Sequence, residues 1–195
     1  MPRGGVRGAA LLLVLVAAAG CGGRGLAPAA DPGEVRAVAS TAAVIPAAKR
    51  RPLPAFAGPT LGGGSLDLAS LRGTTLVLNF WASWCGPCRA EQAGLQRASQ
   101  QLAAKGVRVV GVDIADDPVG AMAFVREFKV RYPSVVDRPA VLPARLGSLG
   151  PTFPPYTLVV DRQGRVAARV FGVLPGGAAA AQAAFLDDLV GQVTG

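Results

Sequence analysis

A pair of cysteines separated by two residues is the feature of this sequence most suited to chemistry. Cys85 and Cys88 enclose Gly86 and Pro87, and Trp84 precedes them. Two thiols at this spacing can close a disulfide across one helical turn. A cysteine at a helix start lies next to unpaired backbone N–H groups, which favour its thiolate form. The motif therefore predicts thiol–disulfide exchange, with Cys85 as the attacking thiol and the more buried Cys88 as the resolving thiol.

Two other interpretations of the cysteine pair remain. A permanent structural disulfide is one, although a bridge that closes so short a loop removes little entropy from the unfolded chain. Half of a zinc site is the other, and zinc would require two further Cys or His ligands. The chain has three cysteines and no histidine, and the third cysteine, Cys21, stands near the N-terminus. We therefore favour exchange chemistry and expect no metal.

The composition excludes several other classes of function. Without histidine there can be no Ser-His-Asp triad, Cys-His protease, His-ligated zinc site or CxxCH haem attachment. The formal net charge of +8 would fit a nucleic-acid partner only if the basic side chains were clustered. Residues 53–195 instead carry 13 basic and 10 acidic side chains, scattered along the chain. We expect no nucleic-acid partner.

The N-terminal segment has the pattern of a signal peptide, which we place at residues 1–20. Arg3 and Arg7 precede an apolar run over residues 9–19, which is well short of the ~20 residues that cross a bilayer. Cys21 follows Ala-Gly and resembles the lipidated cysteine of a bacterial lipoprotein, although Ala18 stands where Leu or Val is usual. The alternative is an ordinary secretory signal. Either pattern places the protein outside the cytoplasm, and lipidation would anchor it to the cell membrane on the extracytoplasmic side.

Residues 21–52 are rich in Ala, Pro and Gly and show no sustained periodicity. Such a segment buries too little apolar surface to offset its ordering entropy, so we predict a flexible tether. Its basic end, Lys49-Arg50-Arg51, is predicted to be a solvated charge run, with attraction to anionic lipid head groups as the alternative.

Residues 53–195 are predicted to form one domain in which strands and helices alternate. The continuous apolar run at 74–81 is typical of a central strand buried on both faces, and the cysteine motif follows it at the start of a helix. This order predicts an α/β domain with a mixed sheet covered by helices on both faces. The expected elements are a hairpin at 53–61 and 65–68, strands at 74–81 and 107–114, a helix at 87–105, a helix capped by Asp117 and begun by Pro118, a hairpin at 156–161 and 165–171, and a C-terminal helix that buries Phe185, Leu186, Leu189, Val190 and Val193.

The segment LNFWASWCGPCRAE at 78–91 resembles the active-site segment of the thioredoxin superfamily, and within it the TlpA/ResA-like group, which includes DsbE/CcmG-like proteins. The resemblance covers about 53–195, including FAGPTLGGGSLDLASLRG and PPYTLVVDRQGRV. It implies a thioredoxin fold with an N-terminal β-hairpin extension and no cofactor. It also implies that Cys85 attacks, that Cys88 resolves, and that Pro155 is a cis-proline facing the disulfide.

Two further positions match this group and two depart from it. Asn79 stands where cytoplasmic thioredoxins have a buried aspartate, and Glu91 matches a glutamate kept near the resolving cysteine. Glu91 has a simpler interpretation as an acidic residue in the first turns of a helix. Ala93 replaces a proline that usually kinks the helix, and Pro154 occupies the position before the cis-proline, where Thr, Val or Ile is common.

The resemblance implies an extracytoplasmic, membrane-anchored oxidoreductase that exchanges disulfides with protein substrates. The Gly-Pro dipeptide between the cysteines resembles that of reducing thioredoxins, which favours a reductase. Its electrons would come from a membrane dithiol donor, and it would serve cytochrome c maturation. Three alternatives remain: an oxidase that forms disulfides in secreted proteins, a thiol peroxidase, and a non-catalytic anchored binding module. The peroxidase is disfavoured because Ala82 stands where that family has threonine, and the binding module because both cysteines are present.

Overall fold

The fold is organised around one mixed sheet of seven strands. The structure, a computed structural model, describes residue 1 and residues 41–150 and 153–194. The strand order is β1-β9-β8-β5-β6-β7, and β2 pairs with β9 beside this path. The strands are β1 Thr41–Val44, β2 Arg51–Pro52, β5 Thr75–Trp81, β6 Val107–Ile114, β7 Ser134–Asp137, β8 Tyr156–Val160 and β9 Arg165–Phe171.

Strand β5 lies inside this sheet and leads into the cysteine motif. It runs parallel to β6 and antiparallel to β8, so that Phe80 lies opposite Tyr156 and Trp81 lies opposite Asp113. All seven residues of β5 are buried, as the continuous apolar run predicts for a strand covered on both faces. The strand therefore fixes the backbone immediately before the loop that carries the cysteines.

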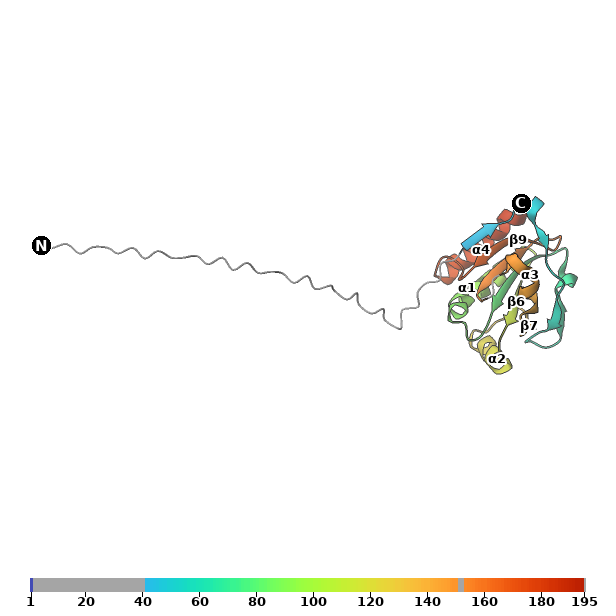
Figure 1. Cartoon of the computed structure of the whole chain (residues 1–195), viewed down its shortest axis with the longest axis horizontal. Helices are drawn as coiled ribbons and strands as arrows, with labels where there is room; N and C mark the ends of the chain where they lie inside the picture. The colour runs from blue at the N-terminus through green and yellow to red at the C-terminus, as the bar shows by residue number, and fades with distance from the viewer. Residues whose placement is uncertain (2–40, 151–152, 195) are drawn as a thin grey trace. The chain divides into compact units, whose positions relative to one another are not determined.

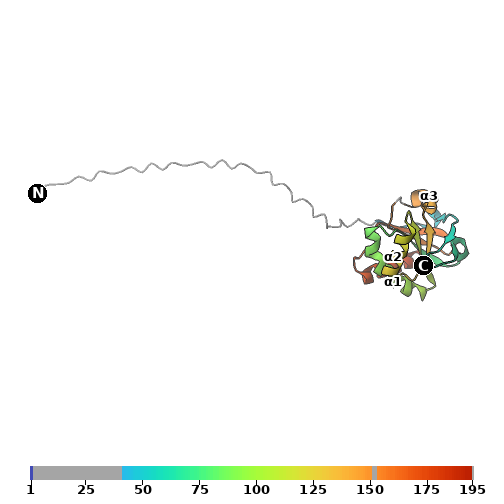
Figure 2. The same ribbon diagram turned by 90° about the horizontal axis from the view of Figure 1, so that it is seen from below.

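Helices cover both faces of the sheet. Helices α1 (Gly86–Ala103) and α4 (Ala179–Thr194) share one core with the sheet, while α3 (Val141–Leu146) packs into a second core on the opposite face. Figures 1 and 2 show α3 across the sheet from α1. Helix α2 (Pro118–Glu127) packs against the end of β5 and both cysteines in a third, smaller cluster. The predicted α/β class, thioredoxin-like fold and mixed sheet are confirmed.

Several predicted elements occur at the expected residues. The first hairpin is confirmed as β3 (Ala57–Pro59) paired with β4 (Ser65–Asp67), and β6 has the predicted bounds. Asp117 caps α2, because its side chain accepts hydrogen bonds from the N–H groups of Val119 and Gly120. The short 3-10 turns are η1 Ala47–Lys49, η2 Leu68–Leu71 and η3 Gly147–Leu149.

Among the strands and α-helices after residue 53, β7 and α3 were not predicted. Strand β7 has only four residues, and α3 has six and contains Pro143. Their connection is a capping interaction: the Asp137 carboxylate accepts hydrogen bonds from the N–H groups of Val141 and Leu142, both at 2.8 Å. Elements this short carry too few residues for a periodic pattern to stand out.

The predicted start of the folded domain at residue 53 is too late. Strands β1 and β2 both pair with β9, so residues 41–52 belong to the folded domain and not to a tether. Arg50 is not part of a solvated charge run, since its guanidinium donates to the Asp161 carboxylate at 3.2 Å and to the Ile45 carbonyl at 3.1 Å. Backbone pairing and a largely buried ion pair hold this segment although it shows no sustained hydrophobic periodicity. The predicted signal peptide beyond Met1, Cys21, and the rest of the tether up to residue 40 lie outside the described residues.

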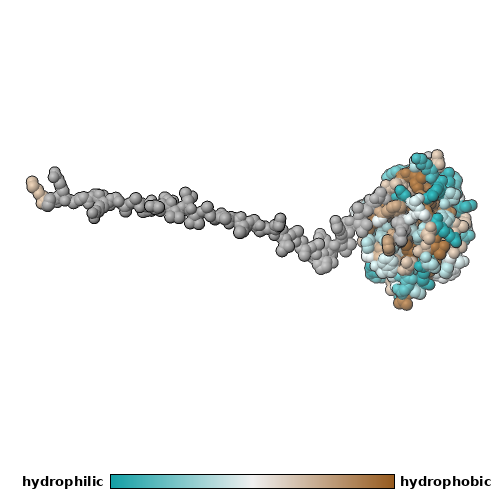
Figure 3. Space-filling model, in the orientation of Figure 1, coloured by the Kyte–Doolittle hydropathy of each residue, from teal (hydrophilic) through white to brown (hydrophobic). Residues whose placement is uncertain are grey.

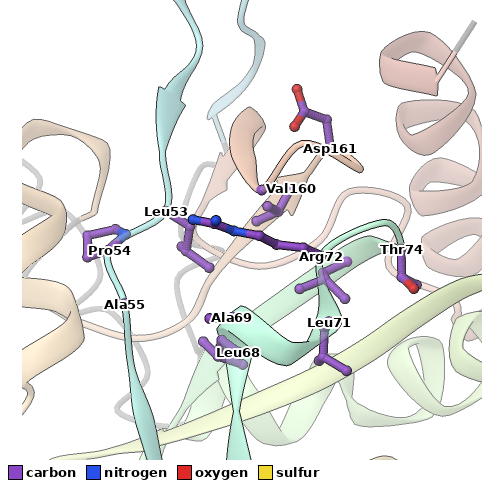
Figure 4. A pocket seen from close by; sticks show the side chains of 12 residues that line it. Leu53, Pro54, Ala55, Leu68, Ala69, Leu71, Arg72, Thr74, Val160 and Asp161 are labelled. Carbon is purple, nitrogen blue, oxygen red and sulfur yellow. The ribbon is translucent and has the colours of Figure 1, made fainter.

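The space behind this N-terminal segment is too small for a substrate. A hollow of about 30 Å³ lies between residues 53–55 and η2, with the Arg72 side chain extending across it (Figure 4). A cavity of this size has room for about one water molecule. Within residues 41–150 and 153–194, no helix combines the length and apolar character that crossing a membrane requires.

The contact between α1 and α4 gives a test of this packing. A methyl group on Gly94 of α1 would lie 2.6 Å from the Cβ atom of Gln182 in α4, whereas one on Gly191 of α4 would meet open space. Gly94→Ala should therefore lower the free energy of unfolding by about 1–3 kcal/mol because the helices must separate. Gly191→Ala should raise it by up to about 1 kcal/mol through helix propensity alone. Urea unfolding of both variants checks the pair, and a stabilised Gly94→Ala would contradict the close packing.

Candidate active site

The two cysteines lie at the N-terminus of α1 and are joined by a disulfide, with their Cα atoms 5.2 Å apart. Cys85 is the N-cap residue, and its Sγ accepts a hydrogen bond from the backbone N–H of Cys88 at 3.1 Å. Cys85 keeps 3% of its surface exposed and Cys88 keeps none. The sulfur of Cys85 therefore occupies the cap position, where backbone donors stabilise negative charge.

The local sequence explains why the helix begins at this point. Gly86 and Pro87 are its first two residues, and proline loses nothing in the first turn because the N–H groups there have no intrahelical acceptor. Trp84 immediately precedes the cysteine, and its side chain is 57% exposed. The Trp84 indole N–H donates to the Ala115 carbonyl at 3.0 Å, which ties the cysteine loop to the loop after β6.

Behind the disulfide lies a buried carboxyl group, that of Glu91 in α1. Asn79 of β5 donates to its Oε1 atom at 2.8 Å, and the backbone N–H of Leu174 donates to its Oε2 atom at 2.9 Å. Asn79 also donates to the hydroxyl of Thr157 in β8 at 3.2 Å. The two polar residues that the family resemblance singled out are therefore in direct contact. Glu91 follows Cys88 by three residues, so both lie on one face of α1.

The Glu91 side chain is fully buried, and this controls its protonation. Burial raises its pKa from an ordinary value of 4.5 to about 7, against the opposing effect of the hydrogen bonds from Leu174 and Asn79. A carboxyl group with such a pKa exchanges its proton near neutral pH. It is therefore suited to proton transfer in a way that a solvated first-turn glutamate is not.

The Pro154–Pro155 peptide bond is cis. Pro155 is buried, and its carbonyl accepts a hydrogen bond from the N–H of Gly172 at 3.1 Å. Because Tyr156 lies opposite Phe80, the proline pair enters β8 beside the end of β5 that leads to the cysteines. Pro154 lies half-buried before it and has no N–H to offer a bound peptide.

The surface near the cysteine loop contains isolated apolar side chains. Phe153 is 73% exposed and Val119, at the start of α2, is 76% exposed. Figure 3 shows apolar residues scattered among hydrophilic ones on the face in view, without one broad patch. Ala93 stands where the resembling group usually has a proline that kinks the helix, and α1 continues through this position as one helix of 18 residues.

Sequence reasoning did not predict several contacts around the site. The Leu174 N–H reaches Glu91 across 83 residues of sequence, and no local pattern could have indicated it. Ser83 donates both its backbone N–H and its hydroxyl to the Asp116 carboxylate. Two adjacent acidic residues, Asp116 and Asp117, precede Pro118. The sequence pattern indicates a helix cap at Asp117 and gives no role to Asp116.

Comparisons with known proteins agree with this geometry. The family model described as Redoxin matches residues 48–184. Thiol-disulfide oxidoreductase ResA of Bacillus cereus is 27% identical over 119 residues, which cover 61% of this chain and 67% of that protein. Thiol:disulfide interchange protein DsbE of Pseudomonas fluorescens biotype C is 35% identical over 126 residues, covering 64% and 67%. The crystal structure of a DsbF homologue from Corynebacterium diphtheriae superposes with a TM-score of 0.66 at 30% identity, covering 81% of this chain and 96% of that one.

The burial of Glu91 predicts a specific pH dependence of stability. Its pKa is about 7 in the folded protein against 4.5 ordinarily, so between these pH values the unfolded chain has released a proton that the folded chain still holds. The contribution of Glu91 to stability is therefore full below pH 4.5 and falls by about 3 kcal/mol as pH rises to 7. Glu91→Gln should remove this loss.

Urea unfolding of the oxidised protein from about pH 4 to 8 measures this effect without interference from titrating thiols. Glu127→Gln serves as the control, since the Glu127 side chain is 54% exposed and should leave the pH dependence unchanged. The proposed protonation of Glu91 is wrong if the wild-type and Glu91→Gln stabilities run parallel across this range.

Proposed function

Because this chain belongs to the Redoxin family and is a thiol-disulfide oxidoreductase of the ResA and DsbE type, we propose that it reduces protein disulfides outside the cytoplasm. The observation that carries this proposal is the Cys85–Cys88 disulfide at a helix N-terminus with the buried Glu91 carboxyl one turn further along. A purely structural bridge has no need of a proton-exchanging group on the same helix face.

The exchange starts from the dithiol form of the protein. The Cys85 thiolate attacks one sulfur of a substrate disulfide, and the other substrate sulfur leaves and takes up a proton. Cys88 then loses its proton and attacks the Cys85 sulfur, which expels the second substrate sulfur. The substrate gains two electrons and two protons, and the protein is left with the Cys85–Cys88 disulfide. The exposed fraction of Cys85 and the full burial of Cys88 support this order.

Glu91 is proposed to manage the proton of Cys88. A carboxylate on the same helix face disfavours a second negative charge at Cys88 and can accept its proton when the mixed disulfide is resolved. The hydrogen bonds from Asn79 and Leu174 hold the carboxyl in place for this transfer. Asn79 is thus proposed to position Glu91 and not to exchange protons itself, because a carboxamide does not titrate.

Substrate polypeptides are proposed to bind beside Pro155 in extended form. The residue before a cis-proline in this position can pair its backbone with a bound strand, which is a form of β-augmentation. Pro154 offers a carbonyl but no N–H, so one backbone hydrogen bond of such a pairing cannot form. The exposed Trp84 supplies apolar contact area next to the attacking sulfur. Gly86 and Pro87 complete the surface between the cysteines.

We also propose a direction of electron flow and a location for the protein. Gly-Pro between the cysteines is similar to reducing thioredoxins, and we therefore propose that a membrane dithiol carrier supplies the electrons. Cytochrome c maturation is the proposed pathway, in line with the ResA-like and DsbE-like resemblance. Cys21 is proposed to carry the lipid that anchors the protein to the extracytoplasmic side of the membrane.

The order of attack can be tested by trapping the mixed disulfide with insulin as the substrate. In a Cys21→Ala background, Cys88→Ser leaves only Cys85, which should form a stable mixed disulfide because no resolving thiol remains. Cys85→Ser should form none and should lose all insulin reduction. Nonreducing electrophoresis and mass spectrometry identify the linked sulfur.

Trapping through Cys88 but not through Cys85 would reverse the assignment of the two thiols. If the protein with both cysteines binds insulin without reducing it, the binding-module alternative holds instead. The reduction potential of the Cys85–Cys88 pair decides the direction, since a strongly oxidising value would identify an oxidase.

Anchoring through Cys21 can be tested by fractionation of the full chain expressed in a bacterial host. Two acyl chains on one cysteine give stable membrane attachment, whereas one chain is marginal. Cys21→Ala should therefore release the protein into the soluble extracytoplasmic fraction while its insulin reduction stays unchanged. Unaltered membrane partition of the variant would indicate an uncleaved signal segment in place of a lipid anchor.

A further inference from the structure

A second buried acid, Asp113 of β6, lies outside the machinery described so far. Its side chain is fully buried, and neither of its carboxylate oxygens has a hydrogen-bond partner among the described residues. The sheet register places it opposite Trp81, the last residue of β5 before the cysteine loop. An isolated charged carboxylate in such a place is strongly disfavoured, so a proton on this group is the expected remedy.

The neighbour of Asp113 is Asp116, which holds the cysteine loop. The Asp116 carboxylate accepts hydrogen bonds from the backbone N–H of Ser83, from the Ser83 hydroxyl at 2.7 Å and from the N–H of Asp117 at 2.9 Å. The adjacent Ala115 carbonyl accepts the Trp84 indole N–H at 3.0 Å. Three hydrogen bonds to the loop after β6 thus hold Ser83 and Trp84, the two residues that immediately precede Cys85.

The charged groups around Asp113 are mostly of its own sign. Burial raises its pKa from an ordinary 3.8 to about 7. The charge of Asp116, the hydrogen bond that a protonated Asp113 can make with Asp116, and the charge of Asp117 act in the same direction. Arg138, just beyond β7, is the opposing cation. Two carboxylates cannot form a hydrogen bond with each other unless one of them carries a proton. A proton on Asp113 therefore explains why no donor faces its carboxylate, because the protonated group can itself donate a hydrogen bond to Asp116.

We propose that Asp113 and Asp116 share one proton and that this carboxyl pair positions the cysteine loop for disulfide exchange. With the proton present, Asp113 donates to Asp116, and Asp116 holds Ser83 in place. When the proton leaves, two adjacent carboxylates repel each other and the hold on Ser83 weakens. Asp113 and Asp116 are positioning residues, because neither is among the groups that exchange electrons or protons with the sulfur atoms.

This inference rests on the proposed exchange at Cys85 and Cys88, and it assigns to Asp113 a role separate from that of Glu91. Glu91 contacts β5 and Leu174 from within α1, whereas Asp113 acts from β6 through Asp116 and Ser83. Loss of the shared proton also adds a negative charge near the cysteine loop. Both effects should slow attack by an external thiolate on the disulfide at high pH.

The test is the rate at which dithiothreitol reduces the Cys85–Cys88 disulfide of the full chain from about pH 5.5 to 8.5. Asp113→Asn supplies a neutral amide that can donate to Asp116 at every pH and so mimics the protonated acid. The ratio of the variant rate to the wild-type rate cancels the titration of dithiothreitol itself. We expect a ratio within about 2-fold of one at about pH 6 that rises to roughly 3- to 10-fold at about pH 8, with its midpoint at about 7.

Three control variants isolate the effect of Asp113 from the effects of the other acidic side chains. Glu91→Gln should keep the transition that Asp113→Asn removes, and Asp188→Asn, at a position on α4 remote from the cysteines in sequence, should match the wild type. Asp116→Asn should slow reduction at every pH, because a carboxamide cannot accept all three hydrogen bonds equally well. In the oxidised wild type, tryptophan emission should change with the same midpoint, a readout that does not depend on any variant folding.

A rate ratio that is flat across pH, or an emission titration removed by Glu91→Gln and kept in Asp113→Asn, would overturn the inference. Neither result would affect the proposed function, which fails only if the wild-type dithiol does not reduce insulin. The two outcomes are therefore distinguishable in the same set of proteins.

Discussion

The carboxyl group of Glu91 joins three parts of the fold at one buried point. It belongs to α1, it accepts a hydrogen bond from Asn79 in β5, and it accepts another from the Leu174 backbone beyond β9. A buried acid that lost either donor would be left with an unsatisfied oxygen, which is costly in an apolar core. This contact therefore helps to fix the direction of α1 away from the end of β5, and with it the position of both cysteines.

The arrangement gives the disulfide a buried acid on each of two elements. Reduction of the Cys85–Cys88 bond adds two electrons and two protons. Glu91 is proposed to handle the proton of Cys88, whereas Asp113 is proposed only to position the cysteine loop. Glu91 lies one turn beyond Cys88 in α1 and Asp113 lies near the end of β6, and burial raises the pKa of each to about 7. Because they occupy different elements, one can change its protonation without directly breaking the hydrogen bonds of the other.

Sequence reasoning succeeded where a residue type had a local physical meaning. Pro118 after Asp117 indicates a helix start, the apolar run before Trp81 indicates a buried strand, and two cysteines after that strand indicate exchange chemistry. It failed where structure depends on partners distant in sequence. Residues 41–52 belong to a segment rich in Ala, Pro and Gly that shows no sustained periodicity, and we predicted it to be a tether. In the structure β9 supplies their backbone partners and Asp161 pairs with Arg50. The contact of Glu91 with Leu174 and the isolation of Asp113 likewise become visible only when the sheet is assembled.

The pairing of β1 and β2 with β9 has a mechanical consequence. A force applied to the chain at residue 41 would act first on the hydrogen bonds between β1 and β9. Strand β1 lies at the edge of the sheet, and β9 and β8 separate it from β5. The hydrogen bonds that Arg50 donates to the Asp161 carboxylate and to the carbonyl of Val193, near the end of α4, would resist the same force. Tension from the proposed lipid anchor would therefore act on an outer strand and on the C-terminal end of α4 before it reached the cysteine loop further inside the sheet.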